Sequence, residues 1–423
     1  MGITPATGLP TEGDVNLQAA QNNANLSGSS SSSSASVGVS FGAQNGVTVA
    51  ASRGRGGEAG NDTWYDNTHV SAGNTIVIQS GADTTLSGAV VSANQAQANV
   101  GGNLSIESLQ DTSTYQSRSS NSGGSITFSP AGVPTGASLS AGHSRIDSDY
   151  ASVNERSGIE AGDGGFQVSV AGNTTLNGGV IASTQQAVDQ SSNSFTTGGT
   201  LTATDIQNTA SYEGNAVGIS GGVGQLSNGN YGVSGLGAGV GEDSGNASSV
   251  TTAGISGVAG DTSVRTGDAR SGIDPIFEKD KVQKEIDAQV AITMEFGKQA
   301  TRAIGDYATR KFNELKDVDP EEAAKWAEGG IYRVGLHALV GGLAGGIEGA
   351  TGAFASQLTI DAVATQIATL DIPDELRATL IAGAGALVGA AVGNGAGAAS
   401  AFNATVNNYL KHSTNWRSSW PTP

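Results

Sequence analysis

The sequence contains no cysteine among its 423 residues. This absence excludes disulfide bonds, thiolate metal sites and cysteine nucleophiles. Aromatic residues make up only 5% of the chain and hydrophobic residues 37%, while glycine occurs 64 times. This composition is thin for one large hydrophobic core but sufficient for a repeat architecture, so it disfavours a conventional single-core enzyme.

Basic residues are also scarce, with 20 Lys and Arg against 38 Asp and Glu and a formal net charge of −18. Such a surface repels phosphates, so we expect no nucleic-acid partner. Residues 1–15 have neither a basic region nor an apolar stretch of the kind found in signal peptides. If the protein is exported, we expect the export signal to lie elsewhere and this chain to be the downstream part of something larger.

Signals for catalytic chemistry are missing from the sequence as well. The histidines His69, His143, His337 and His412 are scattered, without the spacing of a helical metal site. No nucleophile elbow, phosphate loop or dinucleotide fingerprint occurs in a convincing context. The sequence therefore predicts no catalytic residue, no metal site, no cofactor and no enzymatic activity.

An internal repeat is the main feature that the chain does contain. Residues 71–93, SAGNTIVIQSGADTTLSGAVVSA, are echoed by residues 168–183, VSVAGNTTLNGGVIAS. Residues 109–115 match residues 206–212 at an offset longer by seven, which indicates an insertion that we assign to a loop. With a partial earlier copy, about two and a half units fill residues 15–260.

Each unit alternates two kinds of sequence. Short β-branched runs at 75–78, 84–86, 89–91 and 103–106 are separated by glycine with asparagine or aspartate, which predicts strands and tight turns. Stacked rungs of a parallel β-helix would let such short strands pair. The Gly/Ser-rich halves, 117–148 and 214–246, contain short patches in which apolar and polar residues alternate, which predicts hairpins projecting from the rungs. We interpret the glycine runs as separators within the repeat. For the serine run at 29–34 we expect disorder.

The composition changes after about residue 272. Residues 275–315 are charged and nearly free of glycine, with apolar residues close to helical spacing, which predicts a long amphipathic helix. Packing against neighbouring helices and a role on a membrane surface both fit this pattern. Asp319 followed by Pro320 predicts the start of a second helix, which Gly329 and Gly330 would end.

Two later segments, 334–360 and 378–402, carry glycine at four-residue spacing, which places the glycines on one helix face. These are Gly341, Gly345 and Gly349 in the first segment and Gly385, Gly389, Gly393 and Gly397 in the second. Each glycine costs a helix about 1 kcal/mol relative to alanine, and close helix approach is the usual compensation. Three hypotheses stay open: a membrane anchor, a soluble helical hairpin, and a hairpin across 334–402 that inserts into a target membrane after delivery. Arg333, His337 and Glu348 argue against insertion of the first segment.

The repeats resemble a known family. The order GNTIVIQSGADTTLSGAVVSANQ (73–95), then VGGNLSIESLQDTSTY (100–115), is similar to haemagglutinin repeats in the C-terminal half of filamentous haemagglutinins and of contact-dependent growth inhibition (CdiA-like) exoproteins. The resemblance implies a right-handed β-helical filament on a bacterial surface, exported by an outer-membrane two-partner-secretion transporter. It also implies a receptor on a neighbouring cell and a carrier for a C-terminal toxin.

The C-terminal region resembles the pretoxin segment of the same exoproteins. Residues 336–342 match it, and Asn407, Asn408, Tyr409 and Leu410 resemble the motif at the boundary between carrier and toxin. The chain departs from the better-known Val-Glu-Asn-Asn form because Val406 stands where the acid would be. Asn407 and Asn408 could cleave the chain through a succinimide, or form a polar hinge. Only residues 411–423 follow, too few for a folded toxin, so we expect a toxin that is lost or separately encoded.

Together these observations predict a mostly β fold, with parallel β-helix-like repeats and projecting hairpins, followed by an all-α C-terminal domain. We divide the chain into a disordered lead (1–14), haemagglutinin-type repeats (15–271), a helical pretoxin-like domain (272–410) and a short tail (411–423). The predicted function is non-enzymatic delivery of a toxin by a secreted protein of the bacterial surface. The alternative is an adhesin that binds molecules of a host or neighbouring cell.

Overall fold

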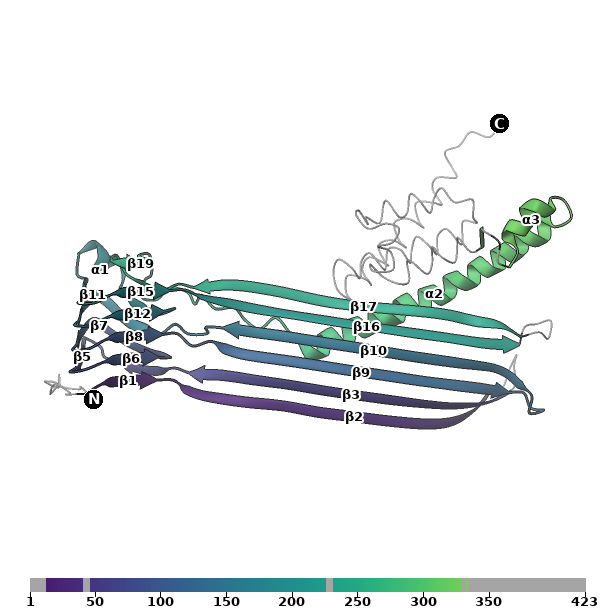
Figure 1. Cartoon of the computed structure of the whole chain (residues 1–423), viewed down its shortest axis with the longest axis horizontal. Coiled ribbons are helices and arrows are strands. Elements are labelled where there is room, and N and C mark those ends of the chain that lie inside the picture. Colours follow the sequence, from purple (N-terminus) through teal and green to yellow (C-terminus); the bar gives the residue numbers. More distant parts are fainter. Residues whose placement is uncertain (1–12, 41–45, 226–230, 329, 331, 334–423) are drawn as a thin grey trace, which may run out of the picture.

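Short strands stack into a β-helix at one end of the molecule, and six long strands project from it as a separate sheet (Figure 1). The computed structural model describes residues 13–40, 46–225, 231–328, 330 and 332–333. Rungs and hairpins alternate along the described chain, one short helix interrupts the rungs, and two further helices come last.

One wall of the β-helix is a five-stranded parallel sheet. Its strands, in spatial order, are β1 (Val15–Gln18), β6 (Thr84–Ser87), β8 (Leu104–Glu107), β12 (Thr174–Asn177) and β15 (Leu201–Thr204). Each has four residues, because a rung needs only one short run before the chain turns to the next wall.

The other wall has eight strands and is parallel except at its last pair. Its strands are β4 (Thr68–Ser71), β5 (Thr75–Ser80), β7 (Ala89–Val100), β11 (Gly158–Val170), β13 (Val180–Ala182), β14 (Ser194–Thr197), β18 (Gly254–Ile255) and β19 (Ala259–Gly260). Strands β7 and β11 are the long central pair, and the other strands flank them.

The interior of the β-helix is a pair of aliphatic ladders. In the five-stranded wall, Leu86, Ile106 and Leu176 are paired in register on successive rungs, and all three are fully buried. In the eight-stranded wall, Ile159 pairs with Ile181, and both are fully buried. Because each rung places its inward residue over the last, a polar sequence needs only one or two large apolar residues per rung.

A ladder of polar side chains stacks the turns between rungs. The Asp83 carboxylate accepts a hydrogen bond from Asn103 N at 2.7 Å, and the Asn103 side chain accepts one from Asn173 N at 2.9 Å. The Asn173 side chain in turn accepts one from Thr200 N at 2.8 Å. The glycine that ends β6, Gly88, and its repeat partner Gly178 both have positive φ, which side chains rarely tolerate. This geometry explains why both copies keep glycine at 88 and 178, and why the equivalent turn positions 83 and 173 carry side chains that can accept a hydrogen bond.

The seven-residue insertion forms a helix, so its assignment to a loop was wrong. Where β7 is continuous in one copy, the later copy has β13, then the helix α1 (Gln185–Asp189), then β14. The Thr184 hydroxyl accepts a hydrogen bond from Ala187 N and caps the helix. Ala187 is fully buried, so α1 packs against the wall and does not hang from it.

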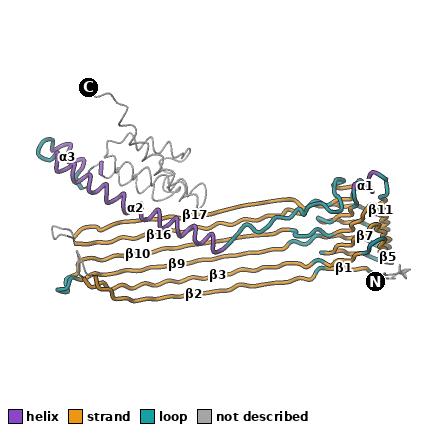
Figure 2. The backbone as a smooth tube through the Cα atoms, turned by 180° about the vertical axis from the view of Figure 1, so that it is seen from behind, coloured by secondary structure: helices purple, strands orange, loops and turns teal. Residues whose placement is uncertain are grey.

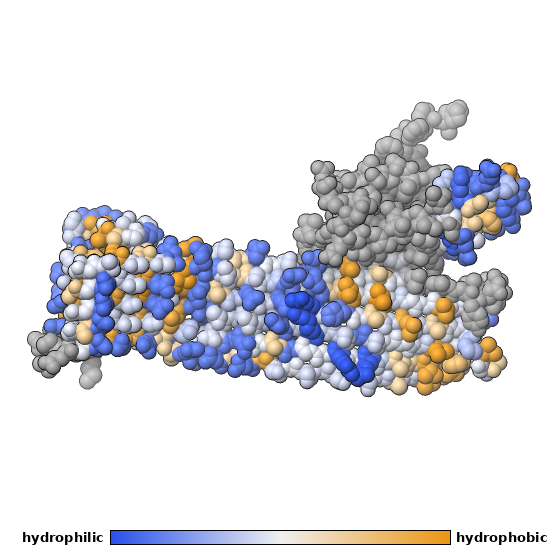
Figure 3. All heavy atoms as spheres, viewed as in Figure 1, coloured by the Kyte–Doolittle hydropathy of each residue, from blue (hydrophilic) through white to orange (hydrophobic). Residues whose placement is uncertain are grey.

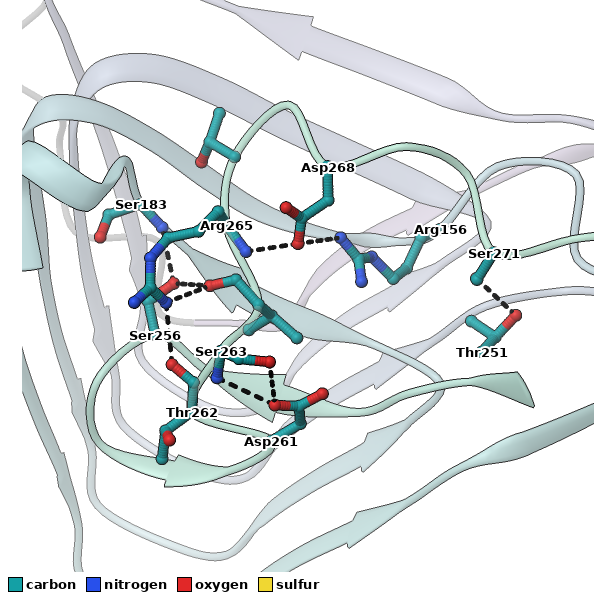
Figure 4. A network of polar contacts seen from close by, with 12 residues as sticks. Arg156, Ser183, Thr251, Ser256, Asp261, Thr262, Ser263, Arg265, Asp268 and Ser271 are labelled. Carbon is teal, nitrogen blue, oxygen red and sulfur yellow. Dashed lines mark hydrogen bonds and ion pairs between the residues drawn. The ribbon is translucent and has the colours of Figure 1, made fainter. Parts of the chain in front are cut away.

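Residues after β17 close the last rung through a polar network (Figure 4). Arg265 donates to the carbonyl oxygens of Thr262 and Val264, each at 2.8 Å, while its backbone N–H binds Asp268 at 2.6 Å. Asp268 also lies 3.7 Å from Arg156, which belongs to the connection between β10 and β11. The network satisfies backbone groups that would otherwise be exposed at the end of the stack.

The projecting sheet is antiparallel and consists of three hairpins side by side (Figures 1 and 2). The hairpins are β2 (Ala20–Ser40) with β3 (Gly46–Asp66), β9 (Asp111–Phe128) with β10 (Pro134–Ser152), and β16 (Ile206–Gln225) with β17 (Tyr231–Thr251). The prediction of projecting hairpins is confirmed. The disorder expected for residues 29–34 was wrong, because each of these serines pairs with a β3 residue through the backbone.

Two helices follow the sheet: α2 (Lys279–Leu315) and α3 (Pro320–Trp326). The predicted long helix is confirmed and begins at Lys279. The predicted start at Asp319 is confirmed too, since its carboxylate accepts a hydrogen bond from Glu322 N at 3.0 Å. Helix α3 ends at Trp326, earlier than the predicted Gly329. The fold class is therefore the predicted one, with β-helix-like repeats, projecting hairpins and helices towards the C-terminus.

Candidate interaction surfaces

The predicted site residues lie outside the described part of the chain. These are the glycines of the two spaced segments, Gly341, Gly345, Gly349, Gly385, Gly389, Gly393 and Gly397, and the boundary motif Asn407, Asn408, Tyr409 and Leu410. The tail (411–423) and all but two residues of the lead (1–14) lie outside it as well. The surfaces that the structure does describe belong to the projecting sheet and to α2.

Helix α2 lies against one face of the projecting sheet, which we call the helix face, over β16 and β17 (Figure 2). Glycines make this approach possible. A Cβ atom on Gly241 would lie 2.2 Å from the carbonyl oxygen of Ile286, and one on Gly239 would lie 2.3 Å from that of Val290. Gly218, directly paired with Gly239, would meet Met294 at 2.6 Å. Alternate glycines on two neighbouring strands thus form a flat bed for the helix.

Polar side chains of α2 also satisfy the outer edge of β17. The Thr293 hydroxyl accepts a hydrogen bond from Val240 N at 2.9 Å and lies 3.1 Å from the Val240 carbonyl oxygen. The Gln289 side-chain oxygen accepts one from Glu242 N at 2.8 Å. At Val240 and Glu242, these bonds supply the partners that a neighbouring strand would otherwise provide.

An aromatic cluster anchors the first turn of the helix. Phe277 packs between Tyr115 and Tyr212, with ring centroids 5.3 and 5.8 Å away. Lys279 forms an ion pair with Glu58, whose carboxylate also accepts a hydrogen bond from Tyr115 at 3.0 Å. These hydrogen bonds, that of Lys279 first, lower the pKa of Glu58. Three strands therefore contribute to holding the start of α2.

A pair of acids, Asp243 of β17 and Glu285 of α2, meets where the helix packs on the sheet. Asp243 of β17 is buried and accepts a hydrogen bond from the Tyr212 hydroxyl at 3.3 Å. Burial, with the neighbouring Asp243, raises the pKa of Tyr212 to about 12. Burial also raises the pKa of Glu285, and Asp243 raises it further. One Glu285 oxygen and the Gln289 side-chain nitrogen are buried without a hydrogen-bond partner among the described residues.

The opposite face of the sheet, the open face, becomes apolar towards the end farthest from the rungs (Figure 3). Val37, Val49 and Ile126 are directly paired across three strands, so their side chains share this face. Val37 is 70% exposed, and Leu139 and Ile219 on neighbouring strands are 74% and 61% exposed. Exposed aliphatic residues gathered in this way mark an interaction surface.

A cleft of 490 Å³ lies at the base of the sheet. Its lining includes Trp64, Asp62 and Tyr150 from the sheet, and Arg270 and Asp274 from the segment that leads to α2. Trp64 is 41% exposed, whereas Tyr150 is nearly buried and donates a hydrogen bond to the Ile273 carbonyl oxygen. The cleft combines a partly exposed tryptophan with hydrogen-bonding groups, and its volume suits a small ligand.

The part of the chain that the structure describes contains neither a cluster of metal ligands nor a helix that could span a membrane. Within it no three His, Cys, Asp or Glu side chains group as a metal site, and His69 instead lies 2.7 Å from Glu155. That hydrogen bond raises the pKa of His69. No described helix has the length and hydropathy needed to cross a bilayer.

The sequence pointed to the projecting hairpins as a place for function, but neither the packing of α2 on the sheet nor the apolar open face was predicted. The glycine runs in this region were interpreted as separators within the repeat. Their alternation on two neighbouring strands was a signal for a closely packed helix. The alternation of apolar residues at 37, 39, 47 and 49 was a signal for the open face.

Comparison with known proteins identifies the chain's relatives. A family model described as "Hemagglutinin repeat" matches residues 4–122. Over 344 residues, 75% of this chain and 31% of the relative, the chain is 36% identical to "Deoxyribonuclease CdiA" of Yersinia pseudotuberculosis serotype O:3 (strain YPIII). It is 39% identical over 315 residues to "Toxin CdiA" of Escherichia coli, covering 67% of this chain and 10% of the relative.

A third relative, "tRNA nuclease CdiA" of Escherichia coli (strain NC101), is 36% identical over 320 residues, 69% of this chain and 9% of the relative. The chain thus spans about a third of the length of the first relative and about a tenth of the others. No solved structure matches it. The repeat match, the stacked rungs and these relatives together show that the chain is a CdiA-like protein of the filamentous haemagglutinin type.

Proposed function

We propose that this chain is the non-enzymatic carrier portion of a contact-dependent growth inhibition system, which presents or translocates a C-terminal toxin into neighbouring bacteria. The observation that carries the proposal is the close packing of α2 against β16 and β17, the last hairpin of the projecting sheet; we call this contact the seat of α2. Backbone contact and edge hydrogen bonds fasten the helical region to the repeats. Whatever follows α2 in the chain is therefore attached to a stiff support.

The proposal includes partners and a location. The chain would be exported by an outer-membrane two-partner-secretion transporter, stand on the bacterial surface and meet a receptor on a neighbouring cell. Its net charge of −18 and stacked, largely polar rungs are compatible with an exposed filament. Nuclease names belong to relatives much longer than this chain. We expect the purified chain to leave DNA and tRNA intact, and cleavage of either would contradict the non-enzymatic part.

Delivery is tested by joining a known toxin domain to the C-terminal end of the chain and growing producer cells with sensitive neighbours. We expect killing by the fusion and none by the same fusion without residues 15–260. A second comparison uses G239A/G241A, which would displace α2, and G38A/G57A, which add the same methyl groups away from it. Loss of killing in the first variant alone supports the proposal. Undiminished killing without the repeats would disprove it.

For the C-terminal region we keep the two predicted sites as proposals. The glycine-spaced segments of 334–402 would insert into the target membrane after delivery, and the Asn407–Asn408 pair would mark the toxin boundary. Leakage of liposomes caused by the whole chain, and its loss in G385L/G389L, would support insertion. Lack of leakage at any pH would exclude it. Mass spectrometry of an N407A/N408A chain beside the unchanged chain would detect self-cleavage.

An adhesin is the second candidate function, and the cleft at the base of the sheet favours it. A partly exposed tryptophan beside carboxylates is a combination that can stack on the apolar side of a sugar ring and bind its hydroxyls. Adhesion of labelled chain to neighbouring cells should then fall in W64A and stay unchanged in W326A, which alters a tryptophan of α3. Equal adhesion by both variants would remove this candidate.

A further inference from the structure

The two edges of the projecting sheet differ in their protection. At the β17 edge, side chains of α2 bind the backbone of Val240 and Glu242. At the β2 edge, the backbone of residues 20–39 has no described hydrogen-bonding partner other than β3. Among the described residues, one edge of the six-stranded sheet is therefore bound by α2 at two positions, and the other presents a row of N–H and C=O groups with no partner beyond β3.

Strand β2 also lacks the usual features that prevent edge strands from associating. Its sequence, AQNNANLSGSSSSSSASVGVS, contains neither charge nor proline. Its pairing with β3 runs without a register shift from Ala20 opposite Asp66 to Ser40 opposite Gly46, so no bulge bends the edge away. Natural sheets commonly block such edges with lysine, proline or a bulge. A bare edge of this length is consequently a surface for pairing with another strand.

Three properties of this edge favour a second copy of the same strand. Its small, neutral side chains cause neither a steric clash nor charge repulsion when two copies meet. Hydroxyl pairs already link adjacent strands of the sheet, as in Ser34–Ser52, Ser119–Ser144 and Ser125–Ser138, each at 2.7 Å. Finally, the sheet itself is built by hairpin-to-hairpin pairing of β3 with β9 and of β10 with β16.

We propose that β2 pairs antiparallel with β2 of a second copy, about a twofold axis perpendicular to the sheet. The product is one continuous sheet in which the two β-helices lie at opposite ends. Because the twofold joint uses the β2 edge of both copies, pairing closes at two copies, and α2 side chains bind Val240 and Glu242 at the other edge. The nearest charges, Arg53, Arg55 and Glu58, lie one strand farther in and do not meet across the joint.

The test measures the mass of the whole chain in solution by sedimentation velocity, from about 1 to about 100 µM, the range in which a micromolar dimer forms. We expect a concentration-dependent dimer. The variant S29K/S31K/S33K places three charges on one face of β2, and S29E/S31E/S33E places three of opposite sign. Each alone should weaken dimerisation at least about tenfold, which corresponds to about 1.4 kcal/mol. An equimolar mixture of the two should dimerise again.

A control variant, S120K/S122K, adds lysines to the same face of the interior strand β9 and should dimerise like the unchanged chain. Circular dichroism of all variants checks that the sheet is folded. A monomeric unchanged chain would overturn the proposal, and the edge would then be free for a strand of another repeat unit. Failure of the Lys and Glu variants to pair in the mixture, or an equal effect of the control, would also overturn it.

Discussion

The seat of α2 can be disturbed at two glycines without altering the helix itself. In G239A/G241A, the new methyl groups would start 2.3 and 2.2 Å from carbonyl oxygens of α2, whereas ordinary contact begins at 3.4 Å. Since these oxygens belong to the backbone, no side-chain rotation relieves the clash. The helix must therefore withdraw from β17 by about 1.2 Å, the difference between those two distances.

The size of the effect follows from what that gap removes. Val282 and Ile286 are buried in the seat, and burial of such side chains contributes about 1.5 to 3 kcal/mol each. A gap of about 1 Å forfeits a quarter to a half of their dispersion contacts, or about 1 to 3 kcal/mol. The hydrogen bonds of Thr293 and Gln289 to β17 add about 1 kcal/mol when both lengthen. We expect a total weakening of about 2 to 4 kcal/mol.

Hydrogen exchange of peptides from residues 282–294 measures this directly. A weakening of about 2 to 4 kcal/mol predicts roughly 30-fold to 1,000-fold faster exchange there. Peptides of the β-helix rungs should exchange as before, since the core of the rungs does not contact α2. The control G38A/G57A adds two methyl groups where no clash occurs, with nothing within 4 Å of one site and one oxygen at 3.8 Å from the other. Unchanged protection of α2 in G239A/G241A would refute the role of the glycine bed.

Three further predictions concern other parts of the chain. Burial raises the pKa of Glu285, so the protonated carboxyl stabilises the packing of α2 on the sheet below about pH 4.5, and this stabilisation is lost as pH rises through the raised value. In E285Q, hydrogen exchange of α2 should no longer depend on pH between about pH 4 and pH 8. An unaltered pH profile in this variant would contradict the prediction. N173A removes one step of the polar ladder and should lower the free energy of unfolding by about 1 kcal/mol in urea titrations. I126S/L139S should change the free energy of unfolding by less than about 1 kcal/mol and should reduce the binding of a dye that reports exposed apolar surface. L176A, in the buried core, should lower that free energy by about 2 to 5 kcal/mol. If both variants lowered it equally, the open face would be covered.

The rungs could be predicted because their signals are local. A β-branched run such as 75–78 and the glycine-asparagine turns that bound it identify a strand from a few residues, and the repeat multiplies the evidence. The N-cap at Asp319 is local in the same way. The helix α1 was missed because the five-residue QQAVD segment has no helical periodicity long enough to detect, and its burial depends on the wall beside it.

Features that depend on distant pairing could not be predicted. The serine run at 29–34 has little intrinsic preference for a strand, and β3, which pairs with it, supplies the backbone hydrogen bonds. The glycines at 239 and 241 resemble turn punctuation until α2 lies on them. Of the predicted site, the glycine-spaced segments and the asparagine pair stay predictions.

The position of α2 has a mechanical consequence. Among the described hairpins, α2 rests chiefly on the one formed by β16 and β17, so a pull on the helix enters the repeats through the last hairpin. Force directed along the strands would load the many hydrogen bonds between β16 and β10 simultaneously, in shear. Force directed across the sheet would instead open them one after another, as in a zipper. The same joint is therefore strong along the length of the hairpins and weak across them, and the direction of a load would decide whether the helix carries the sheet with it or peels away.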